Sequence, residues 1–278
     1  EADALRTFGD LESMSDHNQQ AKGSYNRALL LYKQLGDYEG QVKTLLGMAQ
    51  IEYYLDHFEQ SQNLFEEALH YAQVIKDPLD QAHILRGLGQ LKSICGNFEE
   101  AKSFYNKALI MFKQVSSRSG EAKTWRSLGH LERLLERYDL AHKAYEEALT
   151  IAREISNVRE EAKTLLGLGK LKSKKKEYKE AIEFFNQARM IFSRLNDIWH
   201  EARAWRKIAD VERKLGNYQE ASLAYEQAFS LFHYREDTLE ATNILRKKGT
   251  LEILKNNQKE AAENYQQALE FFQQKSNW

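Results

Sequence analysis

The chain has 278 residues, of which 42% are hydrophobic and 29% are charged, and its formal net charge is −1. This balance is typical of a folded globular protein, and no apolar run approaches the roughly 18–20 residues that cross a bilayer, so a membrane-embedded chain is excluded. The near-zero net charge excludes an overall polycation, so only the distribution of charge can point to a charged partner. Because Cys95 is the single cysteine, no internal disulfide can form, and a reducing, cytoplasmic location is expected.

Seven copies of a 40-residue pattern run along the chain without insertion or deletion. Each copy carries an alanine at one fixed position and an aromatic residue three positions before it. The pairs are Tyr25/Ala28, Phe65/Ala68, Tyr105/Ala108, Tyr145/Ala148, Phe185/Ala188, Tyr225/Ala228 and Tyr265/Ala268. A fixed period of this length predicts a solenoid in which each repeat packs on its neighbours. The repeats of this single array fall at about 1–40, 41–80, 81–120, 121–160, 161–200, 201–240 and 241–278.

Each copy is predicted to form two helices, A and then B, as the repeat at 121–160 illustrates. Its first half places Ala122, Trp125 and Leu128 on one helical face. Its second half places Tyr145 and Ala148 on one face in the same way. Short polar joints connect one hairpin to the next.

Glycine and asparagine mark the turns inside several hairpins, at Gly96, Gly216 and Asn256. Both residue types tolerate the left-handed backbone conformation that ends many helices. Glu136 and Lys176 occupy the same position in other repeats, and we expect their turns to be strained or differently shaped.

A small residue recurs inside helix A, although glycine within a helix costs about 1 kcal/mol relative to alanine. The residues at this position are Gly9, Ala49, Gly89, Gly129, Gly169, Ala209 and Gly249. The repeated cost predicts a close approach of helix B at this point, matched by the small alanines of helix B.

The stretch from Trp125 to Gly129, followed by Ala141, Tyr145 and Ala148, resembles the tetratricopeptide repeat, and the resemblance extends over essentially the whole chain. It implies an all-α, right-handed superhelical solenoid of seven antiparallel A/B hairpins, with the A helices lining a concave groove. Two features depart from the family pattern: helix A carries a charged residue, such as Glu132, where the family has tyrosine, and the closing proline is absent. The period is 40 and not roughly 34, which predicts a helix B about one turn longer. This longer form is similar to Pins/LGN-like polarity scaffolds and to the repeat arrays of signal-transducing NTPases.

The groove positions that the resemblance implies carry many cations in repeats three to seven. They are Arg86, Lys123, Arg126, Arg133, Lys163, Lys170, Arg203, Arg206, Lys207, Arg213, Arg246 and Lys247, together with Lys174 and Lys214. Asp210 is the one anion at these positions. A basic groove favours carboxylates and phosphates, so the predicted function is a protein-interaction scaffold that binds an acidic or phosphorylated segment. We expect Arg126, Arg206 and Arg246 to be exposed.

Three other interpretations of these cations stay open. They form an ordinary solvated surface if helix A glutamates, such as Glu132, Glu212 and Glu252, neutralise them. Alternatively, the array is the ligand-sensing part of a larger NTPase switch. Binding of single-stranded nucleic acid is a weaker alternative, because it needs exposed aromatic platforms, and Trp125 and Trp205 lie at core positions.

A second candidate site is apolar and lies in the first repeats. Leu46, Tyr53 and Tyr54, with Met14 and Ile94 at its edge, predict a pocket for an aromatic or aliphatic anchor of a partner. The alternative is that these residues pack between neighbouring A helices.

The sequence shows no phosphate-binding loop, nucleophile motif or metal-ligand spacing, so no enzymatic activity, cofactor or metal is predicted. Six lysines between Lys170 and Lys179 are typical of a solvated helix end. The start at Glu1 and the apolar end at Phe271, Phe272 and Trp278 predict a fragment of a larger protein, whose last repeat contacts further repeats or another chain.

Overall fold

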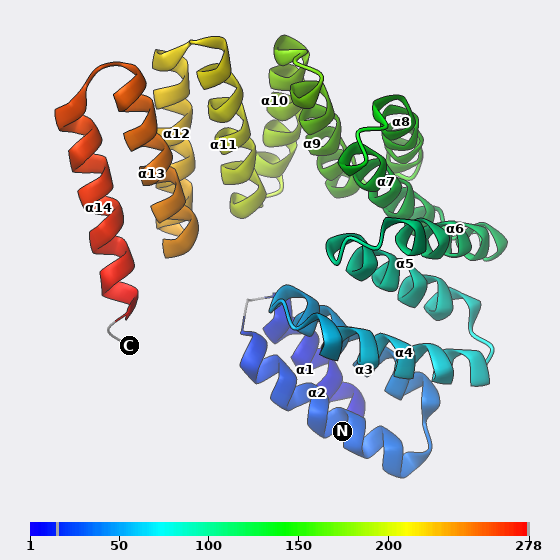
Figure 1. The fold of residues 1–278 in the computed structure, drawn as a ribbon. Helices are drawn as coiled ribbons and strands as arrows, with labels where there is room; N and C mark the ends of the chain where they lie inside the picture. The colour runs from blue at the N-terminus through cyan, green and yellow to red at the C-terminus, as the bar shows by residue number, and fades with distance from the viewer. Residues whose placement is uncertain (15–16, 277–278) are drawn as a thin grey trace. The chain divides into compact units, whose positions relative to one another are not determined.

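The computed structural model describes residues 1–14 and 17–276, which form fourteen α-helices (Figure 1). The A helices are α1 (Ala2–Met14), α3 (Tyr38–Tyr54), α5 (Pro78–Ile94), α7 (Arg118–Leu134), α9 (Val158–Lys174), α11 (Ile198–Leu215) and α13 (Thr238–Leu254). The B helices are α2 (Asn18–Leu35), α4 (Phe58–Val74), α6 (Phe98–Gln114), α8 (Tyr138–Glu154), α10 (Tyr178–Arg194), α12 (Tyr218–Tyr234) and α14 (Gln258–Ser276). The predicted all-α repeat solenoid is confirmed, while Trp278 and the side chain of Met14 lie outside the described residues.

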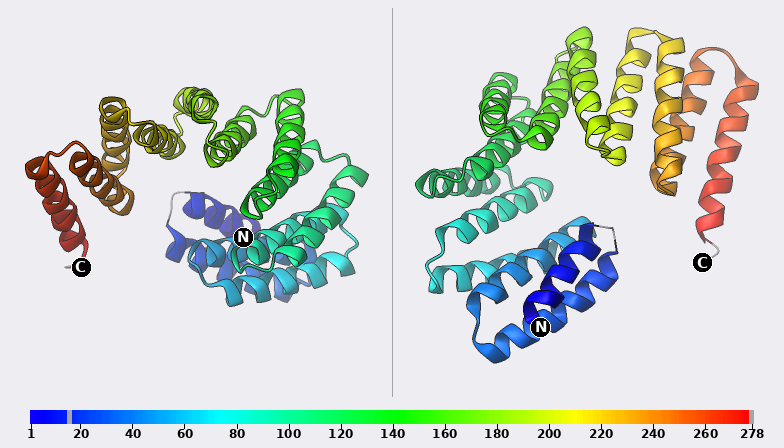
Figure 2. Two further views of the ribbon diagram at one scale, coloured as in Figure 1. Left: turned by 45° about the horizontal axis from the view of Figure 1, so that its top comes forward. Right: turned by 180° about the vertical axis from the view of Figure 1, so that it is seen from behind.

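The chain divides into two compact units, Glu1–Leu135 and Glu136–Trp278. Within each unit every helix packs on the next helix along the chain, an order that can be followed from three directions in Figures 1 and 2. In the first unit each A helix also packs on the following A helix: α1 on α3, α3 on α5 and α5 on α7. The A helices of the first unit therefore share one surface.

From α3 to α10 the two helices of each repeat have the same length, and the prediction that helix B is about one turn longer than in the family pattern stays a prediction. Both α3 and α4 have 17 residues, and so do both α9 and α10. The 40-residue period is divided equally between helix A and helix B, because a turn interrupts the chain every twenty residues.

From Gly36 onward, each turn contains one residue with a left-handed backbone. These residues are Gly36, Asp56, Lys76, Gly96, Ser116, Glu136, Ser156, Lys176, Asn196, Gly216, Glu236 and Asn256. The following amide closes a bond back across the helix end, as when His57 N donates to Glu52 O at 2.9 Å. Glu136 and Lys176 adopt φ of 58° and 64°, so the expected strain is present but a different turn shape is not.

Aspartate or asparagine caps most A helices of the array. The Asp37 carboxylate accepts a hydrogen bond from the Gly40 amide at 2.9 Å, and Asn157 accepts one from the Glu160 amide at 3.1 Å. These side chains satisfy amides that the first helical turn leaves without a partner. The caps therefore fix where helix A begins after each inter-repeat joint.

The left-handed turns predict opposite effects for two exchanges at equivalent positions. Lys176→Gly should raise the free energy of unfolding by about 1 kcal/mol, because glycine adopts this conformation without a Cβ clash. Gly216→Lys should lower the free energy of unfolding by about 1–2 kcal/mol for the same reason. Both residues lie at exposed turn positions, and thermal denaturation followed by circular dichroism compares the variants with the wild type. Equal midpoints in all three proteins would contradict the strain assigned to Lys176.

The core is built around the aromatic residue of helix B, which lies against small residues of two successive A helices. A Cβ atom on Gly9 would lie 2.9 Å from the Tyr25 ring, and one on Gly47, in the next A helix, would lie 2.6 Å from the same ring. The same contacts recur at Gly169 with Phe185 and at Gly87 with Phe65. The predicted close approach is confirmed, but the group that approaches is the aromatic ring.

The glycine contacts predict that one added methyl group destabilises the array at one site and stabilises it at another. Gly167→Ala places a Cβ 2.4 Å from the Tyr145 ring and should lower the free energy of unfolding by about 1–3 kcal/mol. Gly23→Ala is the matched control, because nothing lies within 4 Å of its Cβ and helix propensity should add about 1 kcal/mol. Urea and thermal denaturation measure both effects. A Gly167→Ala protein as stable as wild type would show that the ring can move aside without cost.

Candidate partner-binding surface

The strongest concentration of predicted cations lies on two A helices of the second unit. Arg203, Arg206 and Lys207 project from α11, Lys247 projects from α13, and all four side chains are half-buried. Two acids lie among them, Asp210 of α11 and Glu240 of α13. We call these four cations and two acids the α11–α13 basic surface.

Arg203 contributes a planar cation held by an aromatic ring. Its guanidinium carbon lies 4.3 Å from the centroid of the Trp199 ring, one helical turn earlier on α11. Burial, and then the charge of Arg206, lower the pKa of Arg203, although an arginine remains protonated throughout the physiological range. No described carboxylate lies within salt-bridge distance of it, so ring stacking replaces an ion pair here.

Asp210, the one anion at the predicted groove positions, lies among these cations and has a structural role. It accepts a hydrogen bond from the Tyr225 hydroxyl at 2.7 Å and one from Lys247 at 2.6 Å, while Lys207 Nζ lies 3.9 Å away. Burial raises the pKa of Asp210, but Lys247, Tyr225 and Lys207 more than offset this and hold it below its ordinary value. Burial lowers the pKa of Lys207.

Arg206 is partly neutralised, which weakens one of the predicted contacts. Its Nη1 donates to the Glu240 carboxylate, and its Nε is buried without a hydrogen bond to any described residue. The expectation that Arg126 and Arg206 are exposed is wrong, because both are half-buried, whereas Arg246 is exposed as expected.

The first unit holds a smaller group of predicted cations, around the phenol of Tyr105 and the ring of His83. The charges of Arg86 and Arg126 both act on Tyr105, and those of Arg86 and Lys123 act on His83. His83 packs edge-on against Phe112, with ring centroids 4.9 Å apart. Arg86, Lys123, Arg126 and Arg133 are all half-buried, as are Lys163, Lys170 and Arg213 of the second unit.

The candidate apolar pocket is mostly core. Leu46 and Tyr53 pack against the cluster that contains Val42, Leu45 and Phe65, and burial raises the pKa of Tyr53 to about 12. Only Tyr54 of the three predicted residues is open, with 72% of its surface exposed. The structure therefore brings Leu46 and Tyr53 into the packing between repeats and leaves Tyr54 at the surface.

Charged residues of helix A that replace the family tyrosine are used for contacts outside the basic surface. Glu132 pairs with Lys102 of α6 at 2.6 Å, and Glu252 pairs with Lys255 at 2.9 Å. Glu212 accepts from the Asn217 amide at 2.8 Å. In the lysine run, Lys172 binds Glu177 at 2.6 Å, which gives this helix end its own counter-charge.

Sequence reasoning missed the structural role of the groove aspartate. The Tyr25 hydroxyl donates to Asp10 at 2.6 Å, just as the Tyr225 hydroxyl donates to Asp210. In both repeats the aspartate lies fifteen residues before the tyrosine. Where the aromatic residue is phenylalanine, as at Phe185, the earlier position is Lys170 and not an acid. An acid at this position occurs only in the two repeats whose ring is Tyr25 or Tyr225, whereas Tyr105, Tyr145 and Tyr265 follow Gln90, His130 and Thr250, so the sequence pattern alone does not reveal the structural acid.

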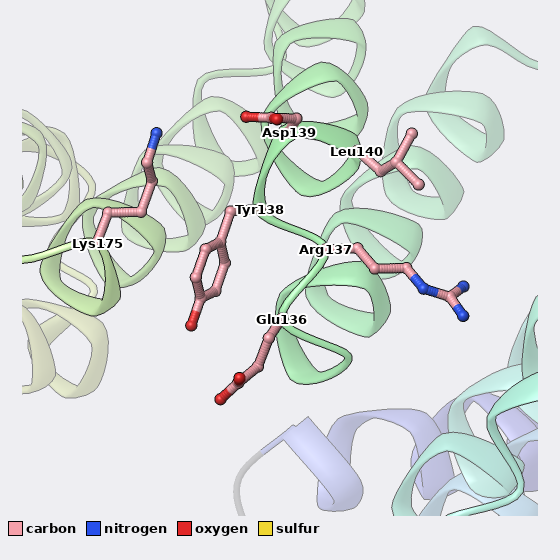
Figure 3. Close-up of a pocket in the computed structure, with 6 residues that line it drawn as sticks. All are labelled: Glu136, Arg137, Tyr138, Asp139, Leu140 and Lys175. Carbon is pink, nitrogen blue, oxygen red and sulfur yellow. The ribbon is translucent and has the colours of Figure 1, made fainter.

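Other features of the described chain do not add to this surface. A shallow pocket of about 360 Å³ lies at the start of α8, lined by Glu136, Arg137, Tyr138, Asp139, Leu140 and Lys175 (Figure 3). Its charges are mixed and its side chains point in different directions. Cys95 is exposed, and no cluster of three or more potential metal ligands occurs in the part of the chain that the structure describes. Every helix within residues 1–14 and 17–276 is too short or too polar to cross a lipid bilayer.

Sequence and structure comparisons agree on the class of protein. A family model described as tetratricopeptide repeat matches residues 80–154, 120–194, 160–233 and 200–274, which overlap to cover most of the chain. The chain therefore belongs to the tetratricopeptide repeat family, whose arrays are protein-interaction scaffolds. No curated protein sequence matches it.

Several solved structures share the fold at low sequence identity. A signal-transduction ATPase with numerous domains (STAND) and a tetratricopeptide repeat sensor, from Pyrococcus horikoshii, is 19% identical with a TM-score of 0.72; the match covers 95% of this chain but only 40% of that one. The apo form of RapI is 18% identical with a TM-score of 0.69, over 100% of this chain and 99% of its own. The Rap conjugation regulator of plasmid pLS20, solved with the Phr* peptide, is 15% identical with a TM-score of 0.72, over 97% and 73%.

Burial around the first-unit cations predicts a pH dependence of stability. Burial, with the charges of Arg86 and Lys123, lowers the pKa of His83 from 6.5 to about 4. Below pH 6.5 the unfolded chain takes up a proton that the folded chain does not, so stability is full above pH 6.5 and falls as the pH drops toward 4. We expect this side chain to account for about 1–2 kcal/mol of the loss, after allowance for its partial exposure.

The measurement compares thermal midpoints at pH 7 and pH 5 for wild type and for His83→Asn, which installs the residue found at this position in the last repeat. The variant should lose less stability on acidification than wild type. Because other titrating groups are common to both proteins, an identical loss in the two would show that His83 titrates normally.

Proposed function

We propose that the array binds an acidic or phosphorylated protein segment along its A helices, with the α11–α13 basic surface as the main contact. The observation that carries this proposal is the excess of cations there: Arg203, Arg206, Lys207 and Lys247 lie together against two acids. One of those acids, Asp210, is already engaged by a tyrosine hydroxyl.

Partial burial strengthens what these cations offer to an anion. A charge whose hydration is incomplete gains more from a new partner than a fully solvated one does, because the local dielectric constant is lower. The Arg203 guanidinium lies over the Trp199 ring, and its N–H groups could form paired hydrogen bonds to a carboxylate or phosphate.

Two features favour a polypeptide over a single-stranded nucleic acid. Arg203 covers one face of Trp199, and Arg189 covers one face of Trp205 with its guanidinium carbon 4.4 Å from the ring centroid. Base stacking needs open aromatic faces, and one face of each of these two rings is already occupied. Support for a peptide ligand also comes from the Rap regulator structure, which was solved with a bound peptide.

A second candidate function is ligand sensing within a larger switch protein. The specific observation is the match to the tetratricopeptide repeat sensor of the STAND protein, which covers 95% of this chain. In that case the α11–α13 basic surface would bind the ligand, and binding would be read out by a domain elsewhere in the protein.

The binding test uses fluorescence anisotropy with three labelled probes: a Glu/Asp-rich peptide, the same peptide carrying phosphoserines, and a neutral Gln/Asn version. The acidic probes should bind, and raised salt should weaken the binding. Arg203→Gln/Lys207→Gln should weaken it at least tenfold, since each charge-assisted hydrogen bond contributes about 1.5–3 kcal/mol.

The matched control is Lys143→Gln/Lys179→Gln, which removes two exposed cations of B helices and gives the same net charge. This control should bind like wild type. Equal weakening by both double variants would reduce the effect to overall charge, and tighter binding of a single-stranded oligonucleotide than of any peptide would replace the proposed partner.

A further inference from the structure

The first unit carries exposed apolar side chains at the ends of three successive A helices. Helix α3 ends at Tyr54, α5 at Ile94 and α7 at Leu134, and these residues are 72%, 51% and 43% exposed. They occupy one repeat position, and α3 packs on α5 as α5 packs on α7. Because packed helices lie about 8–10 Å apart, the three residues extend over roughly 20 Å of the A-helix surface. We call Tyr54, Ile94 and Leu134 the apolar row.

The fold itself does not require an apolar side chain at this helix end. In the second unit, α9 and α11 carry Lys174 and Lys214 at the same repeat position, and both are exposed. Leu254 of α13 is exposed as well, but the A helix before it carries a lysine there, so no row forms. Since the helix dipole favours a cation at a C-terminal end, helix stability does not explain three neighbouring apolar residues, whereas a partner that covers them does.

Small and neutral residues precede the apolar row on the same face of the A helices. On α5, Gly87 and Gln90 lie seven and four residues before Ile94, and these spacings place all three on one side of the helix. Gly47 and Gln50 have the same places on α3. No large or charged side chain therefore stands at these positions beside the apolar row on α3 and α5.

Cations follow, nearer the start of α5 and α7. Arg86, Lys123 and Arg126 lie eight to eleven residues before the apolar row, which is roughly 12–16 Å along the helix axis. The charges of Arg86 and Lys123 both act on His83, each more strongly than the acid Asp77 does. The A-helix surface of the first unit is thus apolar along one edge and basic on the other side of a neutral strip.

We propose that the first unit binds an acidic amphipathic α-helix of a partner protein, laid across α3, α5 and α7. The apolar face of the partner helix would cover the apolar row, and its glutamates and aspartates would face Arg86, Lys123 and Arg126. A helix with its side chains is about 10–12 Å wide, which matches the separation of the apolar and basic sides. The inference is independent of the peptide binding proposed above, because it uses the first unit alone and not the α11–α13 basic surface.

The spacing of the apolar row sets the sequence pattern of the partner. A step of about 8–10 Å from one A helix to the next equals nearly two turns of a helix that crosses them. The partner helix should therefore repeat its apolar residues about every seven positions, with acidic residues along one side of that stripe.

The binding test uses fluorescence anisotropy of the 278-residue chain with labelled peptides of about 20 residues, long enough to span the apolar row as a helix. The first peptide repeats leucine at this spacing, with glutamate along one side of the leucine stripe and alanine elsewhere. The second has the same composition in scrambled order, and the third carries two central prolines. The first peptide should bind at least about tenfold more tightly than the other two, because only it forms a helix with one apolar face.

Three double variants locate the contact. Ile94→Gln/Leu134→Gln should weaken binding of the helical peptide at least about tenfold, because it removes two of the three apolar contacts. The matched control is Ile110→Gln/Leu223→Gln, at positions of B helices that are 58% and 67% exposed, and it should bind like wild type. Arg203→Gln/Lys207→Gln should also leave binding of the helical peptide unchanged, although it weakens binding of the Glu/Asp-rich peptide. The two binding proposals can therefore fail separately.

Circular dichroism establishes that each variant is folded before its binding is measured. A wild-type chain that does not bind the helical peptide, or binds the scrambled peptide equally well, would overturn the proposal. Equal weakening by Ile94→Gln/Leu134→Gln and by its matched control would overturn it too, since the peptide would then adsorb to any exposed apolar residue. Weakening by Arg203→Gln/Lys207→Gln alone would do the same, because it would place the helix on the α11–α13 basic surface.

Discussion

The seating of one aromatic ring against two successive A helices is the contact on which the array depends. Tyr25 lies so close to Gly9 and Gly47 that neither position has room for a Cβ atom, which ties its own hairpin to the following one. Since the ring belongs to both repeats at once, hairpin formation and stacking are parts of a single packing event. An array held together in this way gains its stability from neighbours and not from a central core.

Tyrosine at the ring position adds a polar requirement to this contact. A buried hydroxyl needs an acceptor, and Asp10 and Asp210 supply it from helix A. In the second unit that acceptor also anchors Lys247, so the basic surface is positioned by a hydrogen bond whose origin is core packing. The proposed binding surface and the packing of the repeats therefore share one side chain, Asp210, and a change at Tyr225 would disturb the position of that side chain.

The sequence predicted the repeat architecture well, because the periodic residues report directly on burial: Ala148 and Tyr145 are buried as their spacing indicates. The sequence predicted which cations lie on the A helices but not which of them form ion pairs. Arg206 of α11 pairs with Glu240 of α13, and residue spacing within one helix does not reveal a pair between two helices. Stacking of Arg203 on Trp199 was missed as well, although the i,i+4 spacing on α11 contains it.

The left-handed residue that recurs every twenty positions has a consequence for how such an array can change length. Turns after A helices and turns after B helices share one backbone geometry, so the main chain alone does not distinguish the two joints. A twenty-residue deletion would preserve every reversal of the chain while exchanging the identities of all later helices. Only side chains oppose that error: caps such as Asp37 where A helices begin, and glycines that accept a ring. Insertions and deletions in arrays of this kind should therefore comprise whole hairpins of forty residues. A change of twenty residues would place two B helices or two A helices next to each other, so that aromatic rings would face rings or glycines would face glycines.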